Sequence, residues 1–160
     1  MTTTEVAREA LKRERSVWGV AAAIFCAYLA WDWYWSADQW YVLDRVYVAD
    51  TVEGVPAKMA VDRTIEREFS GAYTVTVRAL PKFTVVCSGG SNVVYRPGSA
   101  LPGSLTFDWW SYGAVPECTN ALKPGKYEAL TCVTIHPDIM LLGNRKVCRT
   151  SNVFTVAART

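Results

Sequence analysis

The feature that most constrains this chain is an apolar stretch near its N-terminus, SVWGVAAAIFCAYLAWDWYW, from Ser16 to Trp35. Ser16 and Asp32 alone interrupt its apolar character. An α-helix rises 1.5 Å per residue, so a helix of about 20 residues is about 30 Å long and matches the hydrocarbon core of a bilayer. The stretch therefore predicts one transmembrane helix over 16–35, preceded by a short tail over 1–15.

The residues that flank this helix give it a direction. Lys and Arg gather on the cytoplasmic side of membrane helices, and Trp and Tyr gather at the headgroups. Arg45 is the only basic residue in the ten positions after the stretch, and aromatic residues crowd that end. The tail is therefore expected in the cytoplasm and the remainder of the chain across the membrane. The basic residues of the tail are Arg8, Lys12, Arg13 and Arg15.

A cleaved signal peptide is the alternative to a retained anchor. Signal peptidases require small residues before the cleavage site. Cleavage after Ala30 would place Tyr28 at the minus-three position, and cleavage after Ala37 would place Trp35 there. Both side chains are bulky, which favours the retained anchor.

Three small residues, Gly19, Ala23 and Ala27, recur every fourth position and so lie on one face of the predicted helix. Small residues at this spacing let two membrane helices approach closely. The face predicts a possible homo-oligomer, although an alanine-rich helix also produces this pattern by chance.

The cysteines are divided between the two parts of the chain. Cys26 lies within the apolar stretch, and Cys87, Cys118, Cys132 and Cys148 follow it. An even number of cysteines in a domain outside the cytoplasm favours disulfides, whereas free thiols would suit a cytoplasmic domain. A hairpin centred near position 140 would place Cys132 opposite Cys148, so we prefer this pair and the remaining pair Cys87–Cys118.

The residues after the helix favour an all-β domain. A link over 36–44 leads into a domain over 45–160 that lacks helical periodicity. Ala72–Leu80 alternates apolar and polar residues, the pattern of a strand with one buried face. About eight short strands separated by turn signals fit a β-sandwich. The candidate segments for these strands are 45–50, 58–61, 64–69, 72–80, 83–88, 93–96, 105–110, 127–135, 146–149 and 153–156, with a turn at Gly89–Gly90. The segments 58–61 and 64–69 are short and are interrupted by the pair Asp62–Arg63.

The run LKPGKY, the strand after it and the terminal SNVFTV resemble the last two strands of immunoglobulin-like or fibronectin-type domains. The resemblance implies that Tyr127 bonds back to the turn before its strand. In true immunoglobulin domains a cysteine follows two residues later, where this chain has Ala129. The run DRTIEREFSGAYTVTVR, together with the whole arrangement of the chain, also resembles small membrane proteins carried by phages and prophages of Gram-negative bacteria, and this resemblance implies no particular activity.

Few residues point to catalysis. His136 is the only histidine, and the turn-like sequence HPD around it favours a structural role. Motifs for metal, nucleotide or hydrolase sites are absent from the sequence, so no cofactor and no metal is predicted. A net charge of +2 with scattered basic residues predicts no nucleic-acid partner. Glu66, Glu68 and Asp108 could serve a glycan-cleaving enzyme, or they could lie on a solvated face.

The cluster Asp108, Trp109, Trp110 and Tyr112 is the candidate binding surface. Neighbouring residues of a strand point to opposite faces, so one Trp is expected between the sheets and the other near the surface. An exposed aromatic side chain can anchor a protein or a sugar.

These features predict a non-enzymatic, single-pass inner-membrane protein whose periplasmic β-sandwich binds or braces another envelope or phage protein. Two alternatives stay open. The apolar stretch could pack against other chains in a virion or a secretion-like assembly, or the carboxylates could act on cell-wall glycan.

Overall fold

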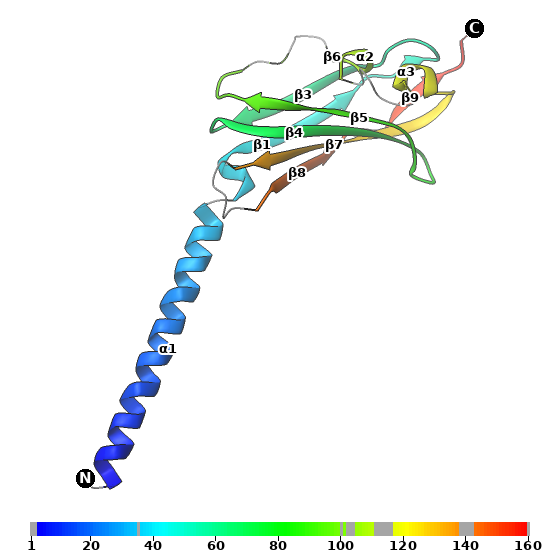
Figure 1. The fold of residues 1–160 in the computed structure, drawn as a ribbon. Helices are drawn as coiled ribbons and strands as arrows, with labels where there is room; N and C mark the ends of the chain where they lie inside the picture. The colour runs from blue at the N-terminus through cyan, green and yellow to red at the C-terminus, as the bar shows by residue number, and fades with distance from the viewer. Residues whose placement is uncertain are drawn as a thin grey trace. The chain divides into compact units, whose positions relative to one another are not determined.

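The computed structural model describes residues 3–34, 36–99, 101, 105–110, 117–137 and 143–159, and within the first helix it describes the side chains of 17–31 and 34. The chain divides into two compact units, Met1–Ser36 and Ala37–Thr160. The first unit is helical and the second is mostly β (Figure 1).

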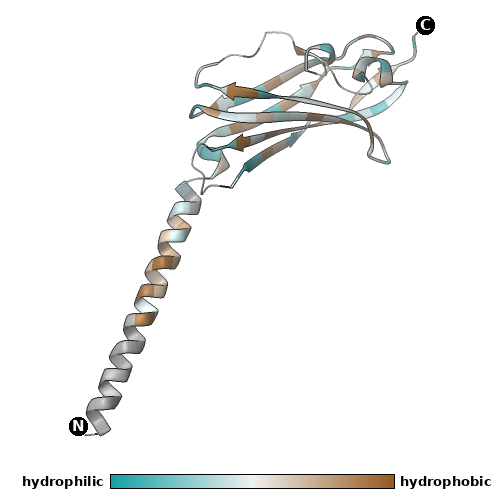
Figure 2. Cartoon of the chain, viewed as in Figure 1, coloured by the Kyte–Doolittle hydropathy of each residue, from teal (hydrophilic) through white to brown (hydrophobic). Residues whose placement is uncertain are grey.

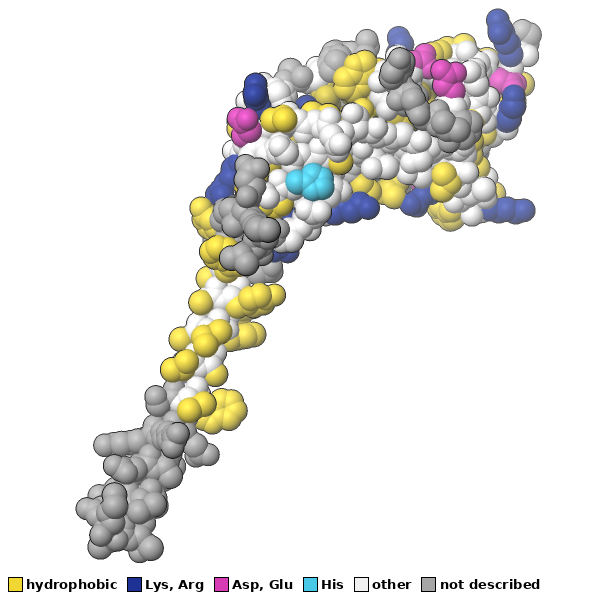
Figure 3. All heavy atoms as spheres, in the orientation of Figure 1, with side chains coloured by type: hydrophobic (Ala, Val, Ile, Leu, Met, Phe, Trp, Pro, Cys, Tyr) yellow, Lys and Arg dark blue, Asp and Glu magenta, His cyan; other side chains and the backbone are white. Residues whose placement is uncertain are grey.

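The first unit consists of helix α1 (Thr3–Tyr34). Alanine, the strongest helix former, recurs through its second half. The described side chains are exposed along the helix, including Trp18, Phe25 and Tyr28. Hydrophobic residues recur along the described part of this helix (Figure 2), and hydrophobic side chains lie on its surface (Figure 3). Among the residues that the structure describes, no helix is both long and apolar enough to cross a membrane, so the predicted transmembrane helix over 16–35 is not found.

The predicted dimer face of α1 is exposed. Gly19, Ala23 and Ala27 are all exposed, and an added Cβ at Gly19 would meet no other atom within 4 Å. A single chain does not test self-association, which stays a prediction.

The second unit contains two packed β-sheets (Figure 1). The smaller sheet has the order β1 (Tyr41–Val48), β3 (Lys58–Ile65) and β6 (Leu105–Thr106). The larger sheet has the order β2 (Thr51–Val52), β9 (Phe154–Ala157), β7 (Gly125–His136), β4 (Phe69–Ala79) and β5 (Thr84–Tyr95), and β8 (Arg145–Thr150) also pairs with β7. The predicted β fold class is therefore confirmed. Three short helical segments complete the unit: η1 (Ala37–Gln39), α2 (Phe107–Trp110) and α3 (Cys118–Ala121).

Several predicted boundaries are wrong. The link predicted over 36–44 contains η1 and the start of β1. The predicted strands 58–61 and 64–69 are instead one strand, β3, followed by the start of β4. The charged pair Asp62–Arg63 does not interrupt β3, because Asp62 is exposed whereas Arg63 is half-buried and lies beside the ring of Tyr95.

Gly89–Gly90 is not a turn, and β5 continues through it. The two glycines pair with Val75 and Thr74 of β4. An added Cβ at Gly90 would lie 2.2 Å from the carbonyl oxygen of Tyr73, so the close approach of the two backbones requires a glycine there. The glycines therefore serve strand packing and not chain reversal.

The core lies between the sheets and holds two groups of aromatic rings. In one group the rings of Phe69 and Tyr95 stack with centroids 4.6 Å apart, and Trp40 and Tyr41 meet Phe69 edge-on. In the other group Phe107 contacts Trp110 and Phe154, and Tyr127 stacks on Phe154. Edge-on and stacked rings at these distances are the arrangements that aromatic side chains prefer.

The side chain of Asn152 joins the smaller sheet to the larger one. Its Oδ1 accepts a hydrogen bond from the backbone N–H of Val48 at 2.8 Å, and its Nδ2 donates to the carbonyl oxygen of Val48 at 2.9 Å. Arg149 of β8 also donates to the carbonyl oxygen of Leu43 in β1. These bonds satisfy backbone groups of β1 that β3 does not reach.

Candidate binding site: the cavity between the sheets

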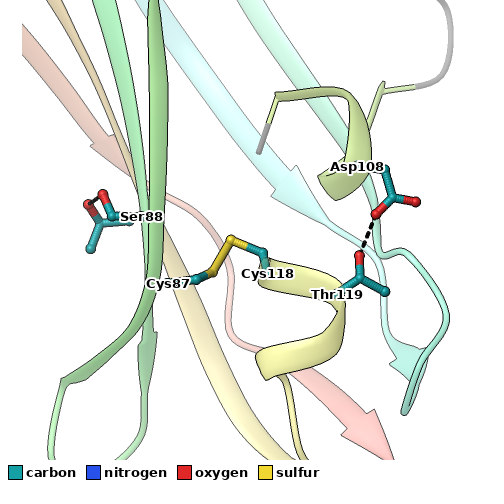
Figure 4. The surroundings of a disulfide bond; sticks show 6 residues. Cys87, Ser88, Asp108, Cys118 and Thr119 are labelled. Atoms are coloured by element: carbon teal, nitrogen blue, oxygen red, sulfur yellow. Dashed lines mark hydrogen bonds between the residues drawn. A yellow bond between two sulfur atoms is a disulfide. The ribbon is translucent and has the colours of Figure 1, made fainter. Parts of the chain in front are cut away.

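Both preferred disulfides are present. Cys132 and Cys148 are directly paired residues of β7 and β8, with their Cα atoms 4.1 Å apart. Cys87 of β5 is bonded to Cys118 of α3, and both residues are buried (Figure 4). Cys26 in α1 is a free cysteine.

The candidate surface around Trp109 and Trp110 is only partly as predicted. Leu105–Trp110 was expected to be a strand, but β6 ends at Thr106 and the helical turn α2 follows. Trp110 is 2% exposed and Trp109 is 52% exposed, so one ring is buried and the other lies at the surface. Tyr112 lies outside the described residues.

Asp108 connects α2 with α3. Its carboxylate accepts a hydrogen bond of 2.6 Å from the hydroxyl of Thr119, which follows the disulfide-bonded Cys118 (Figure 4). The disulfide fixes α3 to β5, and this hydrogen bond fixes α2 to α3. Together they hold the turn that carries both Trp side chains.

The two Trp side chains line a cavity of about 270 Å³ between the sheets. Its other walls come from β3, β4, β5 and β7, and exposed lining residues such as Val93 and Ser99 place its opening at the surface. The lining is mostly apolar, as in sites that bind small molecules. The remaining lining residues are Tyr41, Met59, Val61, Arg63, Tyr73, Val75, Val94, Tyr95, Leu101, Leu105, Thr131 and Val133.

Unpaired polar atoms gather in the wall of this cavity. Among the described residues, Nε of Arg63, Nε1 of Trp110 and Oγ1 of Thr131 are buried and form no hydrogen bond, and all three residues line the cavity. Buried polar groups in proteins are normally hydrogen-bonded, and leaving one unpaired costs about 1–3 kcal/mol. The three residues come from both sheets and from α2, and these three atoms are themselves buried behind the surface of the cavity.

Arg63 lies between two tyrosines. Its Cζ is 5.3 Å from the centre of the Tyr95 ring, and its positive charge acts on the phenol of Tyr41. Burial raises the pKa of Tyr95, and Tyr41 raises it further, while Arg63 opposes the shift. Burial likewise raises the pKa of Tyr41 against the opposing effect of Arg63. Both phenols are therefore neutral at physiological pH.

The carboxylates proposed for glycan cleavage have other environments. Glu68 forms an exposed ion pair with Arg96 at 3.4 Å, Glu66 is exposed, and Asp108 bonds Thr119 as described above. None of the three lines the cavity. Within the described part of the chain, no group of three or more His, Cys, Asp or Glu is placed to hold a metal ion.

His136 lies at the end of β7, beside the loop in which it was predicted. Its Nδ1 lies 3.1 Å from Oδ1 of Asn144, and these two residues come just before and just after that loop. This contact fits a structural role.

The sequence prediction missed the residues that define the cavity, above all Arg63, Tyr41 and Tyr95. Treating Asp62–Arg63 as a strand break concealed the alternation of Met59, Val61 and Arg63 along one face of β3. The signal in the sequence was the position of Arg63, whose basic side chain shares the inward face of the strand with apolar residues.

No protein-family model matches this chain, and no curated protein and no solved structure is significantly similar to it.

Proposed function

We propose that this chain is a non-catalytic binding protein of the periplasm, and that the cavity between its sheets receives an apolar group of its partner. The observation that carries the proposal is the cavity itself, which opens beside the exposed ring of Trp109. Its described lining contains no carboxylate and no histidine, the side chains most used for general acid–base catalysis. This composition favours binding over catalysis.

We further propose that the domain is an immunoglobulin-like sandwich. In that fold strands A, B, E and D form one sheet and strands C, F and G form the other, to which variable-type domains add C′. The order β1–β3–β6 is compatible with A–B–E, and the order β9–β7–β4–β5 is compatible with G–F–C–C′. The hydroxyl of Tyr127 donates to the carbonyl oxygen of Lys123 at 2.7 Å, as the resemblance implied. Ala129 replaces the second cysteine, and the two disulfides join other elements.

The periplasmic location is supported by the two disulfides, because such bonds persist in oxidising compartments. We propose that α1 associates with the inner membrane through its exposed apolar side chains. The aromatic residues Tyr28, Trp31 and Tyr34 near its C-terminal end are of the kind that lies at lipid headgroups. The proposal concerns association with the membrane, and not a crossing.

Flotation of cell membranes in a density gradient tests this association. The full chain is expected to float with the membranes and to be released from them by detergent. Recovery of the chain apart from the floated membranes, in the soluble fraction, would contradict membrane association. Recovery in large, detergent-resistant particles would favour the alternative in which α1 packs against other chains of a virion or a secretion-like assembly.

A variant that fills the cavity tests binding. Val93 lines the cavity, whereas Val85 lies on the same strand, is exposed and does not line it. With para-ethylbenzyl alcohol as a neutral apolar probe, Val93→Trp is expected to abolish binding to the full chain and Val85→Trp to leave it unchanged. Binding that is absent from the wild type, or equal in both variants, would overturn the proposed function.

A further inference from the structure

The cavity carries one further inference, which rests on the proposed function. We infer that its ligand is a small carboxylate with an apolar body, and that Arg63 is the residue that binds the acidic group. The size of the cavity, its charge and its hydrogen-bonding groups each support this ligand class.

The volume limits the ligand to a compact molecule. An engineered apolar cavity of about 150 Å³ holds a benzene molecule. By proportion, a cavity of about 270 Å³ accommodates a group of about eleven non-hydrogen atoms. An aromatic acid of this size fits, whereas a long acyl chain or a glycan does not.

The charge of the wall favours an anion. Arg63 is the only charged residue among the described lining residues, and within the described chain no carboxylate forms an ion pair with it. Its described partners are the neutral side chains of Tyr41 and Tyr95. Charged groups withdrawn from water are normally paired with an opposite charge. An acidic ligand would supply the charge that the protein does not.

The charged group of the wall is a hydrogen-bond donor. The guanidinium of Arg63, which lines the cavity, can donate hydrogen bonds but cannot accept them. A carboxylate offers two oxygens that only accept hydrogen bonds. A protonated amine offers only donors, and it would place a second positive charge beside Arg63. The wall therefore discriminates against cationic ligands.

The experiment compares three probes of one shape that differ in charge: para-ethylbenzoate, para-ethylbenzyl alcohol and para-ethylbenzylamine. Affinities for the full chain are measured by ligand-observed NMR, and the Val93→Trp chain corrects for binding outside the cavity. Because hydrogen bonds to charged groups are the stronger ones, the acid is expected to bind at least about tenfold more tightly than the alcohol. The amine is expected to bind most weakly.

Variants of two arginines assign the preference to one residue. Arg63→Met keeps the length of the side chain and removes its charge, so the acid and the alcohol should then bind within about twofold of each other. Arg45→Met is the matched control, because Arg45 also lies over a tyrosine ring, at 5.4 Å from that of Tyr47, but does not line the cavity. It should keep the preference for the acid. Arg63→Lys keeps the positive charge and should retain part of the preference for the acid over the alcohol. It provides a second test if the Arg63→Met chain does not fold.

The outcomes separate this inference from the proposed function. Equal binding of the acid and the alcohol by the wild type, or an unchanged preference in a folded Arg63→Met chain, would overturn the carboxylate assignment. In both cases the cavity would still bind apolar groups. If none of the probes binds, or if Val93→Trp weakens the binding of none of them, both the carboxylate assignment and the proposed function would be overturned.

Discussion

Asn152 illustrates how much one side chain contributes to the joining of the two sheets. β1 pairs with β3 along one edge, and the amide of Asn152 bonds both backbone groups of Val48. In effect the side chain replaces a neighbouring strand at this position. A side chain that satisfies two backbone groups of a buried residue is expected to matter for stability.

Replacing Asn152 with Ala should lower the free energy of unfolding by about 2–3 kcal/mol, because the N–H and the carbonyl of Val48 would lose their partners. Urea unfolding of the oxidised chain measures the effect. Asn92→Ala is the control, since Asn92 is exposed on the edge strand β5. Equal effects of the two substitutions would show that the bonds of Asn152 contribute no net stability.

The buried phenol of Tyr95 predicts a loss of stability at alkaline pH. Tyrosine ordinarily ionises near 10.0, and burial raises the pKa of Tyr95 in the folded chain. Above the ordinary tyrosine pKa the unfolded chain releases the phenol proton, whereas the folded chain retains it up to the raised pKa. The free energy of unfolding therefore falls as the pH rises through this range. The stabilising contribution is complete below the unfolded pKa and is lost above it.

The replacement Tyr95→Phe should make the decrease of the free energy of unfolding at alkaline pH less steep, by at most about 1.4 kcal/mol per pH unit. Urea unfolding between about pH 8 and pH 11 measures it. Tyr47→Phe removes an exposed phenol and should leave the slope unchanged. A slope that Tyr95→Phe does not alter would show that other groups cause the fall.

At the scale of elements, the two disulfides differ in their surroundings. One joins paired residues of β7 and β8, and Cys148 at its outer end is exposed. The other joins β5 to α3, with Cys87 and Cys118 at 1% and 0% exposure. Thiol–disulfide exchange requires access of the attacking reagent to a sulfur atom.

Mild reduction of the native chain should therefore open Cys132–Cys148 several times faster than Cys87–Cys118. Alkylation followed by mass spectrometry of the peptides measures the two rates. The difference should disappear in urea, where both bonds are accessible. If Cys87–Cys118 opens first in the native chain, the α3 segment must leave β5 more readily than its burial indicates.

For the molecule as a whole, the division into two units predicts that the β domain folds without α1. The second unit, Ala37–Thr160, contains its own core and both disulfides. A chain that begins at Ala37 should unfold within about 3 °C of the full chain, measured by circular dichroism. It should also stay in the soluble fraction of lysed cells. A large loss of stability would show that α1 contributes to the domain.

The features that depend on short-range pattern could be predicted from the amino-acid sequence. Alternation along Ala72–Leu80 predicted a strand, and all of this region except Leu80 lies in β4. The hairpin symmetry around position 140 predicted the partner of Cys132, because residues equidistant from a hairpin tip face each other. The run LKPGKY predicted the backward bond of Tyr127.

The features that depend on contacts between distant segments became visible in the folded chain alone. The strand through Gly89–Gly90 exists because the backbone of Tyr73 in β4 approaches Gly90 too closely for a side chain. Which Trp of the pair 109–110 is buried depended on a helical turn tied to α3 and not on strand alternation. The cavity joins Arg63, Tyr95, Trp110 and Thr131, which come from four separate elements. Periodicity describes neighbours along the chain, whereas a cavity is defined by the packing of segments that are distant in sequence.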